Sequence, residues 1–115
     1  MTVMTQTPRE LGFAMPAEWE PHAGCLMVWP ARPELWGAEL DDAKRDYALV
    51  ADAVGATERV VMVCPPGTAA EVRRTCGSEV TALELPVDDS WARDSGPVFV
   101  RDASGGIAVV SFRFN

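Results

Sequence analysis

Short apolar runs that alternate with an amphipathic helical segment most constrain how this chain can fold. Gly24–Trp29 (GCLMVW) and Arg59–Cys64 (RVVMVC) are continuous apolar runs, each followed by proline, which is typical of strands buried on both faces. Between them, apolar residues recur at helical spacing over Glu39–Val54. Asp41 and Arg45 lie one turn apart there and are expected to pair. A strand, a helix and a second strand in this order indicate mixed α/β layering.

The rest of the chain continues this alternation and then changes to a hairpin. Thr68–Glu71 (TAAE) matches a capping box, so a short helix is expected over residues 69–76, stopping at Gly77. A third strand is predicted at Val80–Leu85, and loops are predicted at Pro30–Pro33 and Pro86–Pro97. A hairpin is predicted from Val98–Arg101 and Ile107–Phe114. The chain stops at an apolar strand without a polar tail, as expected of a domain truncated at its carboxyl end.

The charge of the chain limits its partners. It has 115 residues, of which 48% are hydrophobic, a composition typical of a globular domain. A formal net charge of −7 argues against nucleic acid and anionic membranes, which it repels, and favours a small cationic substrate. Residues 1–14 form a polar leader with no apolar run long enough for a signal peptide or a membrane span. Three widely spaced cysteines suit reduced thiols, so a cytoplasmic location is expected.

The loop that precedes the hairpin concentrates chemically useful side chains. Asp88, Asp89, Trp91, Arg93 and Asp94 lie within ten residues, in a position where α/β enzymes often place their sites. A carboxylate such as Asp94 can accept two parallel N–H bonds from a planar guanidinium, and the face of Trp91 can contact a cation. The competing interpretation is a structural turn, with solvated carboxylates and a salt bridge from Arg93.

Metal binding is not expected from the sequence. His22 and Cys25 have ligand-like spacing, but Cys64 and Cys76 do not supply the second close pair that structural zinc usually requires. The Asp88–Asp94 carboxylates are not accompanied by a phosphate-binding loop or by EF-hand spacing.

Several motifs in order along the chain resemble the agmatine deiminase family, relatives of the peptidylarginine deiminases. They are Met15–His22 (MPAEWEPH), Trp29-Pro30, Trp91–Pro97 (WARDSGP) and Phe114-Asn115. The resemblance spans residues 15–115, which are therefore expected to be the amino-terminal part of an agmatine deiminase-like domain. It implies an α/β fold, a partial α/β propeller (pentein), with this chain as the opening ββαβ-type module of a five-module ring.

The resemblance also implies a reaction, hydrolytic deimination of a small guanidine. In this family a cysteine thiolate attacks the guanidinium carbon, ammonia leaves, and water releases a ureido product, turning agmatine into N-carbamoylputrescine for putrescine and polyamine formation. Asp94 matches the carboxylate that binds the guanidinium, and Trp91 is expected in or beside that pocket. Arg93 is expected to be a structural ion-pair partner, because a cation facing a cationic substrate would repel it. No cofactor is implied.

The family's catalytic nucleophile is expected outside these residues. The nucleophilic cysteine and the general acid/base histidine are both expected beyond Asn115, whereas Cys25, Cys64 and Cys76 are interpreted as inert, mostly buried thiols. The isolated chain is therefore expected to be inactive, and either poorly soluble or a homo-oligomer. A catalytically inactive remnant or assembly piece and a bacterial peptidylarginine deiminase remain alternatives.

Overall fold

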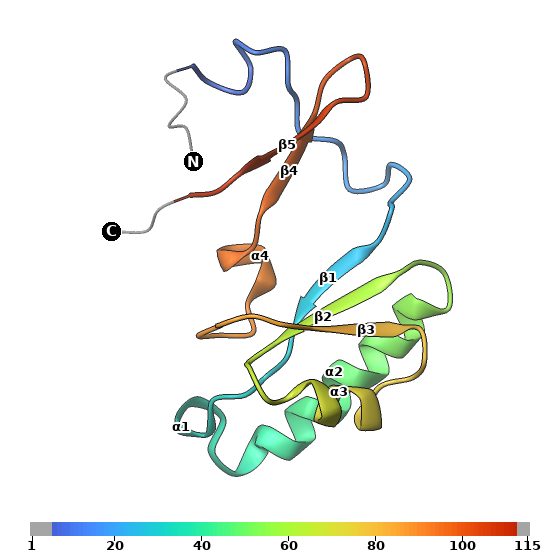
Figure 1. Ribbon diagram of the computed structural model, residues 1–115, viewed down its shortest axis with the longest axis vertical. Helices are drawn as coiled ribbons and strands as arrows, with labels where there is room; N and C mark the ends of the chain where they lie inside the picture. Colours follow the sequence, from blue (N-terminus) through green and yellow to red (C-terminus); the bar gives the residue numbers. More distant parts are fainter. Residues whose placement is uncertain (1–5, 113–115) are drawn as a thin grey trace. The chain divides into compact units, whose positions relative to one another are not determined.

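A parallel three-stranded sheet is the framework of the segment His22–Ala92. In the computed structural model, which describes residues 6–112, its strands are β1 (Cys25–Val28), β2 (Val60–Cys64) and β3 (Val80–Glu84), in the spatial order β1-β2-β3 (Figure 1). All three strands lie within the predicted ranges. The predicted alternation of strands and helices is therefore confirmed.

Two helices cover one face of this sheet. They are α2 (Leu40–Gly55) and α3 (Ala69–Thr75). Alternate residues of β2 face these helices and form the core, in which Val60, Met62 and Cys64 pack with Ala51 and Val72, all fully buried. Short alanine side chains on α2 let the helix approach the sheet closely.

A partly buried polar network ties Trp29, the residue that follows β1, to both helices. The indole N–H of Trp29 donates to Glu71 Oε2 at 3.1 Å, and Lys44 Nζ donates to Glu71 Oε1 at 2.6 Å. Burial acts to raise the pKa of Glu71, but the hydrogen bonds from Lys44 and Trp29 outweigh it, so this pKa lies below its usual value. The carboxylate therefore stays ionised between the helices at neutral pH.

The opposite face of the sheet is apolar and partly exposed. Leu26, Leu83 and Leu85 project from this face, with 40%, 44% and 46% of their surfaces exposed. We call these three residues the open sheet face. Within residues 6–112, β1 and β3 each pair with one neighbour, so each also has one free edge.

The predicted capping box at the start of α3 is wrong. The Thr68 side chain makes no capping hydrogen bond and instead donates to Pro65 O at 2.7 Å, while the Glu71 carboxylate is engaged by Trp29 and Lys44. Glu84, at the end of β3, takes over this role, because its Oε1 accepts from Gly67 N at 3.0 Å and from Ala69 N at 2.9 Å.

Two further local predictions need correction. Arg45 pairs with Asp42 rather than with Asp41, because a spacing of three residues also places two side chains on the same helix face. The loop predicted over Pro30–Pro33 is followed by two elements that were not predicted, α1 (Pro33–Trp36), which already includes Pro33, and a 3-10 turn, η1 (Gly37–Glu39). Proline at the first helical position favours this short helix.

The second unit combines the two ends of the chain, Met1–Pro21 and Arg93–Asn115. Its hairpin consists of β4 (Val98–Arg101) and β5 (Ile107–Val110), and residue 14 forms an isolated antiparallel bridge with Arg101. The hairpin is confirmed, but β5 ends at Val110; the predicted end at Phe114 lies outside the described residues. The turn is held by Asp102 Oδ1, which accepts from Ser104 N and Gly106 N, each at 2.8 Å.

Among residues 6–112, no helix is both long enough and apolar enough to cross a membrane.

Candidate substrate-binding segment

The two predicted substrate-binding residues lie at the start of a short helix, α4 (Ala92–Ser95), within the segment predicted as a polar loop. Trp91 directly precedes this helix and has 58% of its surface exposed. Asp94 lies within the helix, and its side chain is also exposed. An exposed indole and an exposed carboxylate are both accessible to a ligand. Trp91 belongs to the sheet unit and Asp94 to the unit formed by the chain ends.

Arg93 is held by the amino-terminal motif. Its guanidinium lies 2.6 Å from Glu18 Oε1, within the unit formed by the chain ends. In the same unit, Glu20 pairs with Arg101 of β4. The two signature segments, residues 15–22 and 91–97, are therefore joined by an ion pair, and the prediction that Arg93 is an ion-pair partner is confirmed.

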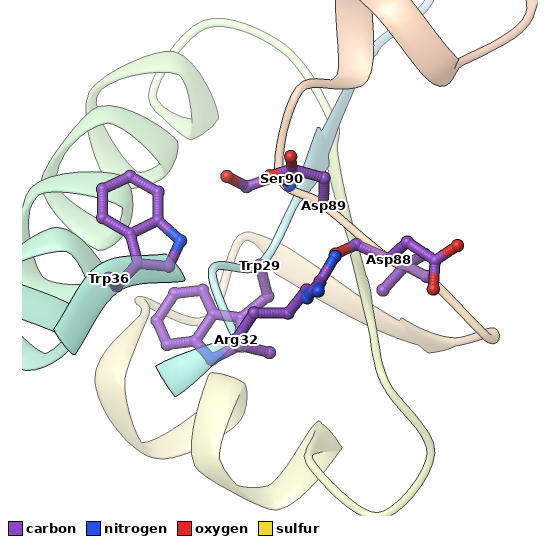
Figure 2. Close-up of a pocket in the computed structure, with 8 residues that line it drawn as sticks. Trp29, Arg32, Trp36, Asp88, Asp89 and Ser90 are labelled. Atoms are coloured by element: carbon purple, nitrogen blue, oxygen red, sulfur yellow. Dashed lines mark hydrogen bonds between the residues drawn. The ribbon is translucent and has the colours of Figure 1, made fainter. Parts of the chain in front are cut away.

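The turn before Trp91 is fixed from within the sheet unit. Arg32, in the loop after β1, donates from a terminal guanidinium nitrogen to the Asp88 carbonyl oxygen at 3.2 Å, and its Nε donates to Glu34 at 2.7 Å. Asp89 Oδ1 accepts from the backbone N–H of Ser90 at 2.7 Å. Figure 2 shows Arg32 reaching toward Asp88 and Ser90 lying above it. The carboxylate-rich turn is thus partly ordered by side chains rather than being simply solvated.

The three thiols of the chain lie in environments that suppress reactivity. Cys64 is fully buried at the end of β2. Burial, and then the charge of Asp52, raise the pKa of Cys76 to about 11. Burial, and then Glu58, raise the pKa of Cys25 as well, although Cys25 is less buried than predicted. A raised pKa means that little nucleophilic thiolate exists at neutral pH.

His22 contacts a carboxylate. Its Nδ1 lies 3.3 Å from Glu58 Oε1, and the His22 side chain is half exposed. In the described part of the chain, no three His, Cys, Asp or Glu side chains are arranged to hold a metal ion.

Sequence reasoning did not identify Glu18, Arg32 and Ser90 as residues of this segment. Glu18 lies inside the quoted motif Met15–His22, and its opposite charge to Arg93 was the available signal. Arg32 is 56 residues from Asp88, a separation at which no local pattern indicates a contact.

Comparisons with known proteins place these features in a family. The sequence profile of the Porphyromonas-type peptidyl-arginine deiminase family matches residues 14–115. The chain is 40% identical over 117 aligned positions to the agmatine deiminase of Stutzerimonas stutzeri (strain A1501), covering 100% of this chain and 32% of that protein. It is also 40% identical, over 116 positions, to the agmatine deiminase of Pseudomonas aeruginosa (strain LESB58), again covering 100% of this chain and 32% of the relative.

The fold agrees with a solved relative. The structure superposes on the agmatine deiminase of Enterococcus faecalis with a TM-score of 0.87 and 32% sequence identity, covering 93% of this chain and 29% of that one. The chain thus spans about a third of the length of the relatives it matches. The predicted fold class is confirmed, since the mixed α/β structure corresponds to part of the pentein fold of these enzymes. On sequence and fold together, the chain belongs to the Porphyromonas-type peptidyl-arginine deiminase family, with agmatine deiminases among its relatives.

Proposed function

We propose that this chain contributes substrate-binding residues to an enzyme that deiminates agmatine, giving N-carbamoylputrescine and ammonia for putrescine formation. The observation that carries the proposal is the 40% identity, over the whole chain, to proteins named as agmatine deiminases. The exposed Trp91 and Asp94 lie inside this matched region and suit a planar cation.

Each residue of the segment has a distinct part in this proposal. Asp94 binds the guanidinium through two parallel N–H···O bonds and orients its central carbon for attack. Trp91 contacts the cation with its indole face. Arg93 does not touch substrate; its positive charge is paired with Glu18. Two residues bind, and one holds the segment in place.

The nucleophile of the proposed reaction is none of Cys25, Cys64 and Cys76. Attack on the guanidinium carbon requires a thiolate, whereas Cys64 is fully buried and the pKa values of Cys25 and Cys76 are raised. We place the nucleophilic cysteine and the acid/base histidine in sequence beyond Asn115. There the thiolate adds to the carbon and ammonia leaves; water then adds and releases the ureido product together with the thiol.

The two candidate functions, agmatine deiminase and peptidylarginine deiminase, differ in their substrate. The family description names peptidyl-arginine, whereas relatives 40% identical to this chain are named for agmatine, which makes agmatine the first choice. The net charge of −7 favours a small free cation and disfavours nucleic acid and anionic membranes. We also propose that the protein is soluble and cytoplasmic, that its thiols are reduced, and that it requires no cofactor.

An assay for ammonia and N-carbamoylputrescine tests it, run on the purified 115-residue chain and on the product of the extended reading frame. We expect agmatine turnover only in the extended product, with an arginine-containing peptide as the comparison substrate. Turnover in the short chain would show that one of its three thiols is the nucleophile. Turnover of the peptide alone would change the substrate to peptidyl-arginine, and no turnover in either form would favour a catalytically inactive assembly piece.

A further inference from the structure

A small cavity lies beside the turn that leads into Trp91. Its volume is about 10 Å³, and it is bordered by Trp29, Arg32 and Trp36 on one side and by the turn Val87–Ser90 on the other. Figure 2 shows the side chains of these residues, with Ser90 and Asp89 above Arg32, and Trp36 on the helix beside them. A space of this size accommodates roughly one water molecule.

The Ser90 hydroxyl is the unusual group in this cavity wall. Ser90 is only 5% exposed, and its Oγ has no hydrogen-bond partner among residues 6–112. A hydroxyl that is removed from solvent without a partner costs free energy, and such groups in folded proteins are usually satisfied by a bound water. Because Ser90 borders this cavity, a water held there is the candidate partner for its hydroxyl.

The opposite wall supplies suitable partners for a water. A buried water typically makes about 2–4 hydrogen bonds. The indole N–H of Trp36 and the guanidinium of Arg32 are donors that face this space in Figure 2. A water oxygen can accept from these donors while one of its protons is donated to Ser90 Oγ.

We infer that this cavity is a hydration site, in which one ordered water joins the Ser90 hydroxyl to the loop that follows β1. Ser90 is then a positioning residue for Trp91. The Ser90 carbonyl oxygen accepts from Ala92 N at 3.0 Å, so this hydrogen bond joins the residues on either side of Trp91. Arg32 reinforces the same turn through the Asp88 carbonyl. The role of Ser90 in catalysis rests on the proposed function of Trp91. The hydration site itself does not depend on that function.

The sign of one stability change tests the hydration site. If the water is present, Ser90→Ala removes a satisfied hydroxyl and leaves the water one partner short, so the melting temperature falls by several degrees. If the cavity is dry, the same change removes an unsatisfied polar group, so the melting temperature stays the same or rises, which overturns the inference. Ser78→Ala is the control, because Ser78 is exposed and its hydroxyl donates to Glu79 Oε1 of the neighbouring residue.

A second measurement examines the site directly. A high-resolution crystal structure of the extended product should show a solvent peak within hydrogen-bond distance of Ser90 Oγ that is absent in Ser90→Ala. A cavity without such a peak in the unsubstituted protein overturns the inference.

Steady-state kinetics test whether Ser90 positions Trp91. In the extended product, Ser90→Ala should lower kcat/KM for agmatine roughly tenfold, mainly through KM, while Ser78→Ala leaves it unchanged. Unchanged kinetics together with a lowered melting temperature would reject the role in positioning Trp91 while retaining the water. Absence of guanidine turnover in the unsubstituted protein would instead reject the proposed function, and the melting and solvent-peak results would still decide the hydration site.

Discussion

Asp94 presents its carboxylate at the surface of α4, next to an arginine that is already paired with Glu18. Replacing Asp94 with asparagine keeps the shape but removes the charge that would attract a guanidinium. In the extended product we expect Asp94→Asn to lower kcat/KM for agmatine by roughly 30-fold, the loss associated with about 2 kcal/mol from a charged hydrogen bond. Steady-state kinetics measure this change.

The control is Asp41→Asn, which removes an exposed carboxylate from the first turn of α2. It should leave the kinetics unchanged, because Asp41 is remote in sequence from the signature segment. Kinetics for Asp94→Asn that match those of the control would remove Asp94 from the binding site.

The raised pKa of Cys76 should make the stability of the chain depend on pH. Its pKa is raised from 9.0 to about 11 in the folded chain, so between these values the folded state holds a proton that the unfolded state has lost. The resulting contribution is fully present below pH 9 and is lost as pH rises through about 11. Urea unfolding should therefore show stability falling across this range, and Cys76→Ala should flatten the fall. An unaltered slope in Cys76→Ala would contradict the raised pKa.

At the scale of elements, the amino terminus of α3 depends on a residue that lies in β3. Glu84 accepts hydrogen bonds from Gly67 N and Ala69 N, and these bonds lower its pKa. Glu84→Gln should therefore destabilise the chain more than Thr68→Ala, whose side chain caps nothing. Urea denaturation of both variants compares the two effects. A larger loss from Thr68→Ala would show that the Thr68 bond to Pro65 O contributes more than the cap from Glu84.

The longer elements were predictable because their signals are local. Continuous apolar runs located β1 and β2, and helical spacing located α2 to within one residue at each end. The short helices α1 and α4 span four residues each, too few for a periodic pattern to develop.

Contacts between distant segments were beyond the reach of sequence reasoning. The cap of α3 comes from 15 residues away, and the Arg32 bond to Asp88 spans 56 residues. At the candidate site, the sequence predicted the ion pair of Arg93, whereas the binding roles of Trp91 and Asp94 stay predictions. The orphaned hydroxyl of Ser90 was not predictable, because burial of a single serine depends on how separate loops pack.

For the whole molecule, the open sheet face predicts association. Leu26, Leu83 and Leu85 present apolar surface on a sheet whose opposite face is covered by helices. Apolar patches of this kind favour self-association. We expect the 115-residue chain to form oligomers in light scattering coupled to gel filtration, and Leu83→Lys to shift it toward monomer.

Leu49→Lys is the matched control, since Leu49 is 68% exposed on α2 and is not part of the open sheet face. It should leave the oligomer distribution unchanged. A monodisperse monomer of the unsubstituted chain would rule out the association.

The unit built from both chain ends has a consequence for the order of events during synthesis on the ribosome. The sheet unit is one continuous stretch, His22–Ala92, and can assemble as soon as that stretch has emerged. The motif at residues 15–20 is made first, yet its partner Arg101 lies 81 residues beyond Glu20. Glu20 therefore has no Arg101 to pair with until a further 81 residues have been translated, by which time the whole sheet unit has been made.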